Sequence, residues 1–240
     1  MRPRPAREHA ARHNDYQAPF ALAREAGEGT RVQVAPLIFD GGDLIASEHH
    51  VFATALLLQR NEGGALGERE VLGRWLARHT GQRPVLIGET ADQVPEHHVG
   101  MFLTPLGGRR VLVGDPDLGL SLLPRGAALP RAVERRPGEL ERFRRVAREL
   151  RAQGFTVIPA PLVPLRESLT YVTYNNAILE RRADGRLHAY VPQFGIETLD
   201  AAGRAAYAGE GVVVHPIDVR RVFQHNGTVR CLVNVLRRGG

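Results

Sequence analysis

The chain has 240 residues, of which 43% are hydrophobic and 24% are charged, and this composition excludes a mainly disordered protein. The net charge is +6 and every basic residue is Arg, but the densest basic stretch, Arg131–Arg151, is interspersed with Glu, which favours a solvated helix face over a nucleic-acid surface. No apolar run approaches the ~20 residues of a membrane helix, and the N-terminus lacks the apolar core of a secretory signal. Because Cys231 is the single cysteine, no internal disulfide can form, and we expect the protein in the reducing cytoplasm.

Hydrophobic periodicity predicts the elements of the first half of the chain. Residues 1–30 are a poorly patterned N-terminal segment, and we assign residues 31–240 to a single domain. Alternating or short apolar runs predict strands, whereas apolar residues at helical spacing before Gly81 predict a helix. In chain order the predicted elements are a strand at Arg31–Phe39, a turn at Asp40–Asp43, strands at Leu44–Ser47 and Val51–Gln59, a helix at Gly67–His79 and a strand at Pro84–Gly88.

The same order of elements recurs twice. The second round is predicted as strands Val99–Leu106 and Arg110–Gly114, helix Gly138–Gln153 capped by Gly154, and strand Phe155–Pro159. The third is predicted as strands Leu169–Tyr174, Asn176–Glu180 and Leu187–Val191, helix Leu199–Ala208, strand Val212–His215, a helical turn at Ile217–Phe223 and a final strand at Val229–Leu236. One such unit cannot bury its own apolar faces, so neighbouring units must pack together in an α+β fold. Pattern alone leaves an unrelated α+β arrangement open.

Cys231 is the first candidate for chemistry. A lone cysteine is more often a small buried hydrophobic residue than a nucleophile. Here the thiol closely follows a glycine-containing turn and directly follows Arg230, and a nearby cation favours the reactive thiolate. A catalytic cysteine also needs a histidine that the fold brings close.

The pair His97-His98 is the best histidine candidate, because it precedes a predicted strand and the mouth of a sheet is where sites form. Zinc binding is the alternative. It requires spaced Cys and His ligands, yet no cysteine lies near the histidine pairs in the sequence, and adjacent side chains diverge in an extended strand. We therefore predict no metal site.

Asp40-Gly-Gly-Asp43 is the third candidate. Two glycines between two carboxylates favour a sharp turn that directs an acid inward, where it could orient a histidine or bind a cationic substrate group. A plain hairpin turn remains the alternative.

These three pieces, in this order, resemble the guanidine-modifying enzymes of the pentein superfamily, which include the arginine, agmatine and peptidylarginine deiminases and dimethylargininase. That family shows an acidic Gly-Gly turn, then a histidine that leads a strand, then a cysteine near the C-terminus. The stretches that carry the resemblance here are Asp40–Asp43, His98-Val-Gly-Met-Phe102, Val191-Pro-Gln-Phe-Gly195 and Gly227-Thr-Val-Arg-Cys231-Leu-Val-Asn234.

The resemblance implies a fold and a mechanism. The fold would be an α/β-propeller built of five ββαβ modules, with one front module missing or reduced here because the Asp40 turn falls early in the chain. The Cys231 thiolate would attack the guanidinium carbon, and His98, oriented by Asp40, would protonate the leaving amine and then activate water on the thiouronium intermediate. No metal or organic cofactor is implied.

Two departures from the family pattern bear on activity. Many members have His-x-Asp, whose acid grips the guanidinium, whereas this chain has Gly100 after His98 and Val99. A second acid, in a segment resembling W-x-Q-D, is replaced by Ala18. Each lost charge-assisted hydrogen bond is worth roughly 1.5–3 kcal/mol.

Two hypotheses follow. The first is a Cys-dependent amidinohydrolase of deiminase or dimethylargininase type with catalytic Cys231, His98 and Asp40, acting on a small guanidino compound. The second is a non-catalytic pentein that binds a ligand or a protein partner. We expect no membrane partner, the case for nucleic acid rests on charge alone, and a homo-oligomer stays open. Candidate substrate-binding residues are Asp43, Arg60, Asn175 and Gln193, with Asn176 as a further one to line the site.

Overall fold

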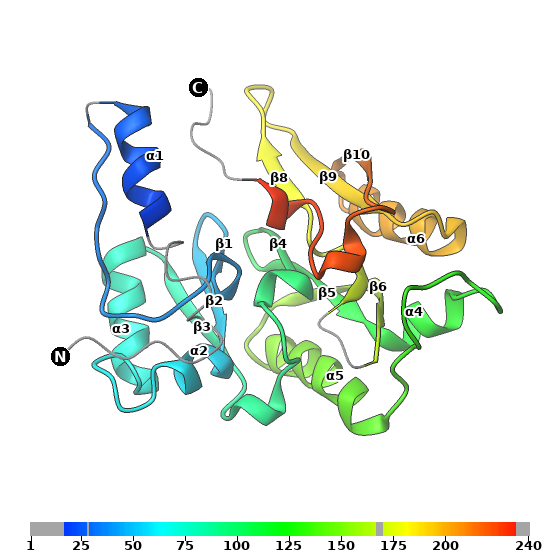
Figure 1. Cartoon of the computed structure of the whole chain (residues 1–240), viewed down its shortest axis with the longest axis horizontal. Coiled ribbons are helices and arrows are strands. Elements are labelled where there is room, and N and C mark those ends of the chain that lie inside the picture. Colours follow the sequence, from blue (N-terminus) through cyan, green and yellow to red (C-terminus); the bar gives the residue numbers. More distant parts are fainter. Residues whose placement is uncertain (1–16, 28, 167–169, 234–240) are drawn as a thin grey trace.

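The computed structural model describes residues 17–27, 29–166 and 170–233. Within these residues, three β-sheets and the helices between them form a mixed α+β fold, as the sequence predicts (Figure 1). In each sheet the first two strands pair antiparallel, and a strand that follows a helical connection pairs parallel to the second. Such parallel pairing requires a crossover, which the helices supply.

The first sheet contains β1 (Ile45–Ala46), β2 (His50–Thr54) and β3 (Arg83–Ile87), with α2 (Ala55–Arg60) and α3 (Arg69–Thr80) in the connection. The second contains β4 (Leu103–Gly107), β5 (Arg110–Asp115), β6 (Thr156–Pro164) and β7 (Tyr171–Thr173), with α4 (Pro116–Leu122) and α5 (Pro137–Ala152) between β5 and β6. The third contains β8 (Ile178–Arg181), β9 (Leu187–Gln193) and β10 (Val213–Asp218), with α6 (Glu197–Ala208) between β9 and β10.

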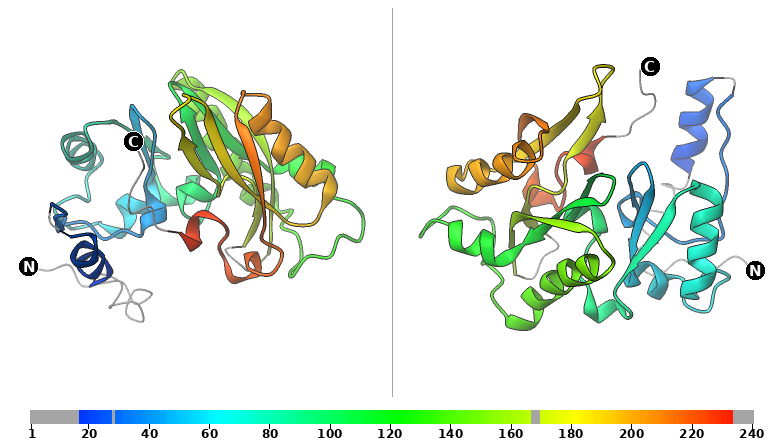
Figure 2. Two further views of the ribbon diagram at one scale, coloured as in Figure 1. Left: turned by 90° about the horizontal axis from the view of Figure 1, so that it is seen from above. Right: turned by 180° about the vertical axis from the view of Figure 1, so that it is seen from behind.

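Helices and sheets alternate through the molecule. Helix α3 covers one face of the first sheet, α5 packs between the first and second sheets, and α6 packs between the second and third (Figures 1 and 2). The spacing of apolar residues explains this arrangement: Leu140, Phe143, Val146 and Leu150 form one buried stripe along α5. Gly154 follows α5 with a φ of +82°, the left-handed conformation that favours glycine at the end of a helix.

In the N-terminal segment, the residues that the structure describes include helix α1 (Ala18–Ala26), which has no buried residue. The strand predicted at Arg31–Phe39 is wrong: these residues adopt no regular element. At Ile38 the backbone N–H and C=O bond to the side-chain amide of Asn61, at 2.8 and 2.9 Å, in place of a strand neighbour. Val34, in the same segment, is 77% exposed.

Several predicted strands begin or end at the wrong place. The strand predicted at Phe155–Pro159 continues to Pro164 as β6. The strand predicted at Val51–Gln59 ends at Thr54, and the run of good helix formers from Ala55 continues as α2, which buries Leu57. The strand predicted at Val99–Leu106 starts only at Leu103, because Val99–Met101 form a 3₁₀ turn, η5, closed by the hydrogen bond from Met101 N–H to His98 C=O. His98 thus leads a turn that precedes the strand.

The C-terminal predictions also change. Strand β10 extends to Asp218, and the helical turn lies at Phe223–His225. The final strand predicted at Val229–Leu236 is absent up to residue 233, since Arg230–Leu232 form another 3₁₀ turn, η7, whose first N–H bonds to Asn176; residues 234–236 lie outside the described part. Helix α4 was not expected, because the sequence around it is rich in Pro and Gly.

Candidate active site

The Asp40 turn is a tight 3₁₀ turn, η3 (Gly41–Asp43), whose two carboxylates cap it reciprocally. The N–H of Asp40 donates to Asp43 Oδ2 at 2.8 Å, and the N–H of Asp43 donates to the Asp40 carbonyl at 3.0 Å. Asp43 is 5% exposed, and burial raises the pKa of its carboxyl, while the Asp40 N–H and the Arg60 charge act in the opposite direction. The turn therefore fixes one buried acid and one accessible acid.

Arg60, the last residue of α2, bridges these two acids. Its Nη1 lies 3.4 Å from Asp40 Oδ2 and also contacts Asp43 Oδ2. A guanidinium shared by two carboxylates compensates much of their charge. Arg60 is thus engaged with Asp40 and Asp43 through Nη1.

His98 contacts the same turn. Its Nε2 lies 3.3 Å from Asp40 Oδ2, and its ring rests against Gly42, where an added Cβ would lie 2.5 Å from Nδ1. The backbone N–H of His98 donates to Nδ1 of His97 at 2.7 Å, and the His97 ring packs edge-on against Tyr171. His98 is therefore oriented by Asp40 through its ring and by His97 through its backbone. The Asp40 carboxylate thus fixes Nε2 of the ring, while Nδ1 lies on the side of Gly42.

Cys231 lies in η7 and is exposed. Its Sγ lies 3.4 Å from Nδ2 of Asn176, and a Cβ added at Gly227 would lie 3.3 Å from the sulfur. Asn176 sits between β7 and β8 and is 2% exposed. The thiol is accordingly held from one side by a buried amide and is open to solvent.

The turn η5 lies between the residues around Asp40 and those around Cys231. It starts directly after His98, and at its other end Met101 Sδ lies 3.0 Å from Nδ2 of Asn176. Between them, Gly100 lies against the Arg230 guanidinium, which an added Cβ would approach to 3.1 Å. The structure thus brings Asp40, Asp43, Arg60 and His98 together on one side of η5 and Cys231 with Asn176 on the other.

Two other predicted residues lie elsewhere. The Asn175 side chain is fully buried, and its Nδ2 donates to the Leu112 carbonyl at 3.1 Å. Gln193, on β9, donates to the Pro192 carbonyl at 2.7 Å and accepts from Arg204. Sequence reasoning did not single out Thr228 or Met101, which contact the Asn176 side chain; an uncharged side chain with no motif of its own gives no signal in a sequence.

Arg230 is largely buried, and this burial lowers the pKa of its guanidinium. Its Nη2 donates to the Ala177 carbonyl at 2.6 Å. In the described part of the chain no carboxylate forms an ion pair with it. The site therefore carries a cation beside Cys231, at the position where many members of the resembled family place an acid.

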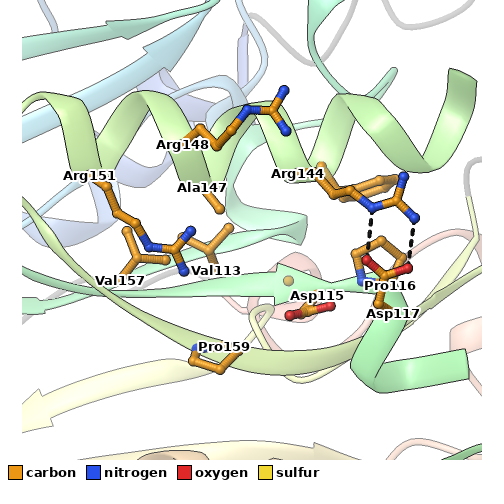
Figure 3. A pocket seen from close by; sticks show the side chains of 12 residues that line it. Val113, Asp115, Pro116, Asp117, Arg144, Ala147, Arg148, Arg151, Val157 and Pro159 are labelled. Atoms are coloured by element: carbon orange, nitrogen blue, oxygen red, sulfur yellow. Dashed lines mark hydrogen bonds and ion pairs between the residues drawn. The ribbon is translucent and has the colours of Figure 1, made fainter. Parts of the chain in front are cut away.

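A cavity of about 220 Å³ lies away from these residues, between α5 and strands β5 and β6 (Figure 3). The ion pair between Arg144 and Asp117 lies at one end of it, and Arg151 extends along it. The cavity contains none of the predicted catalytic residues.

None of the helices among the described residues is both long and apolar enough to cross a membrane. Likewise, in residues 17–27, 29–166 and 170–233, no three His, Cys, Asp or Glu side chains gather as a set of metal ligands.

No protein-family model and no curated protein matches this sequence. Solved structures do match its fold. The agmatine deiminase of C. jejuni superimposes with a TM-score of 0.64 at 14% identity, over 91% of this chain and 62% of that one. A cysteine-to-serine form of that enzyme with substrate bound gives 0.59 at 14% identity, over 90% and 60% of the two chains. The agmatine deiminase of Enterococcus faecalis gives 0.51 at 14% identity, over 79% and 55%.

The chain thus spans about 62% of the length of the C. jejuni enzyme. These matches show that it has the fold of the pentein deiminases, and the predicted resemblance is confirmed at the level of the fold.

Proposed function

We propose that this protein is a Cys-dependent amidinohydrolase that cleaves a C–N bond of a small guanidino compound. The observation that carries the proposal is the arrangement around η5, which places an Asp40–His98 pair on one side and an exposed Cys231, held by Asn176, on the other. The fold shared with agmatine deiminases supports the same chemistry. We also propose that the three sheets, each with its helical connection, are modules of a pentein ring, and that the protein acts in the cytoplasm, where a free thiol stays reduced.

The proposed reaction has two steps. In the first, Cys231 Sγ forms a bond to the guanidinium carbon, and the C–N bond to the leaving amine breaks as His98 gives that nitrogen a proton. In the second, His98 takes a proton from water and the hydroxide attacks the same carbon. The S–C bond then breaks to release a ureido product and the thiolate, while the proton of the added hydroxyl group passes to the released amine through solvent. Asp40, 3.3 Å from His98 Nε2, stabilises the protonated ring during the cycle.

The direct test is ureido-product formation from arginine, methylated arginines, agmatine and a peptidyl-arginine. The wild-type protein and Cys231→Ser would be assayed side by side, with folding checked by circular dichroism. Turnover of one of these guanidines that the variant loses would support the proposal and define the substrate class. Absence of turnover by folded wild-type protein across the panel would overturn it.

A second candidate function is binding without catalysis, favoured by the contact between Gly100 and Arg230. A cation at this position repels a guanidinium substrate, and Ala18 supplies no compensating acid. Labelling of Cys231 by a haloacetamidine, a guanidine mimic, separates the two functions. The amidinohydrolase predicts rapid labelling that His98→Ala suppresses, whereas a binding protein predicts labelling at the rate of an ordinary exposed thiol.

A further inference from the structure

The side chain of Asn176 makes several polar contacts around Cys231, and no sequence motif predicts them. Its Oδ1 accepts from Thr228 Oγ1 at 2.8 Å and from the backbone N–H of Arg230 at 2.9 Å. Its Nδ2 lies 3.0 Å from Met101 Sδ and 3.4 Å from Cys231 Sγ. The Cys231 thiol also donates to Oδ1 at 3.6 Å, a longer contact to an oxygen that already accepts two hydrogen bonds.

The orientation of this amide follows from its partners. A backbone N–H can only donate, so the atom that faces Arg230 N must be the amide oxygen. The NH₂ group then faces the two sulfur atoms and is the donor at Cys231. Because Asn176 is 2% exposed, water does not compete readily for this donor.

An N–H donor distinguishes between the two forms of a thiol. A hydrogen bond to an anionic acceptor is roughly twice as strong as one to a neutral acceptor, so the donor favours the thiolate. Cys231 contacts the amide of Asn176 through its sulfur, the Thr228 carbonyl through its backbone N–H, and Gly227, none of which carries a charge. The Arg230 guanidinium also interacts with it, and a nearby cation favours the anion as the amide donor does.

We propose that Asn176 is a positioning residue that aims an amide N–H at Cys231 Sγ and so holds the sulfur in its nucleophilic form. A contribution of Asn176 to turnover rests on the proposed function. Its hydrogen bond nevertheless acts on the sulfur whether or not a guanidine is hydrolysed. Thr228 supports it by fixing the amide oxygen on the opposite side.

The test is the rate at which iodoacetamide, a neutral reagent, alkylates Cys231 in the full chain as a function of pH. In Asn176→Asp the carboxylate keeps both acceptor contacts, with Thr228 and with Arg230 N–H, but presents an anion to the sulfur. We expect the rate at pH 7 to fall about tenfold or more and the midpoint of the pH profile to move to higher pH. Gln82→Glu, the same amide-to-acid change on a side chain that bonds to Ser47 in the first sheet, should leave the profile unchanged.

Thr228→Val provides a second variant should Asn176→Asp unfold. It leaves Asn176 in place but removes one of the two hydrogen bonds to its amide oxygen, the other being the bond from Arg230 N–H. We therefore expect a smaller loss in alkylation rate at pH 7, about two- to threefold. Wild-type profiles for folded Asn176→Asp and Thr228→Val would overturn the inference, even if Cys231-dependent turnover is found. A shifted profile without turnover of any guanidine would support the role of Asn176 and contradict the amidinohydrolase, so the two failures are distinguishable.

Discussion

The two sides of η5 are held in place by different interactions. On the Asp40 side, two carboxylates, a guanidinium and an imidazole contact one another, and they come from three segments separated by up to 58 residues. On the Cys231 side, a single neutral amide contacts the sulfur, and the oxygen of that amide is fixed by one hydroxyl and one backbone N–H. The acid–base half therefore depends on charge and steric contact, whereas the nucleophile half depends on the direction of one side chain.

This difference has a physical consequence. Removing one member of a charged cluster leaves the others with unbalanced charge, which costs more than removing one member of a neutral set. Substitutions of the charged residues Asp40, Asp43 and Arg60 should thus change both chemistry and stability, while those of the partly exposed His98 and of the Cys231 side should change mainly the chemistry. The substitutions below test the site and then the scaffold around it, from the largest expected effect to the smallest.

His98→Asn should have the largest effect. It keeps a polar side chain of similar width but removes the group that carries the proton, a contribution of about 10²- to 10⁴-fold in rate. Because His98 is 27% exposed, its pairing with Asp40 adds little stability, about 1 kcal/mol or less. We expect haloacetamidine labelling and any turnover to fall by that factor with little change in the urea midpoint. Wild-type labelling in the variant would exclude His98 as the acid–base.

Gly42→Ala should have a smaller but still large effect. The added methyl group would lie 2.5 Å from His98 Nδ1 and 2.7 Å from its Cγ, so the ring must leave its position beside Asp40. A displacement of about 1 Å costs on the order of 10²-fold in rate. Gly41→Ala is the matched control, since a Cβ there meets nothing within 4 Å. Equal activity of the two alanine variants would show that the contact between His98 and Gly42 does not matter.

Asn61→Ala should act on folding. Asn61 is buried and bonds to the Ile38 N–H, the Ile38 carbonyl and the Leu57 carbonyl, so it ties the segment before Asp40 to α2. Leaving these groups without their partner should lower the free energy of unfolding by about 1–3 kcal/mol. The neighbouring exposed Gln59, changed to Ala, should alter it by about 0.5 kcal/mol or less. Urea unfolding measures both, and a similar small change for each would remove the proposed role of Asn61.

His50 lies outside the candidate site. Its substitution should have the smallest effect, a change in how the free energy of unfolding depends on pH. Burial and the charges of Arg109 and Arg83 lower the pKa of His50 below its usual 6.5, so the unfolded chain binds the proton more readily. Stability from this group is present above the unfolded pKa and is lost as pH falls below about 6.5. His50→Gln should flatten the decline in unfolding free energy between pH 7 and pH 5. An unchanged slope would assign that decline to other groups.

The amino-acid sequence determined much of the scaffold, because its signals are local. The buried stripe of α5 and the left-handed Gly154 after it follow from the spacing and residue types alone. The tight turn at Asp40–Asp43 also follows locally, since two glycines between two acids favour the reciprocal capping observed. The resemblance carried by the ordered motifs was sufficient to predict the fold that the solved structures share.

The tertiary structure decided what the local pattern could not. The segment Arg31–Phe39 alternates like a strand, yet the amide of Asn61, 23 residues beyond Ile38, takes the hydrogen bonds that a strand neighbour would have used. Val99–Met101 and Arg230–Leu232 read as strand starts, but each becomes a turn where segments distant in sequence meet. Asn175 and Asn176 are adjacent and chemically identical, and only packing directs one to the core at Leu112 and the other to Cys231. Hydrogen-bond partners and side-chain direction depend on residues far away in the chain, so they emerge only when the sheets and helices assemble.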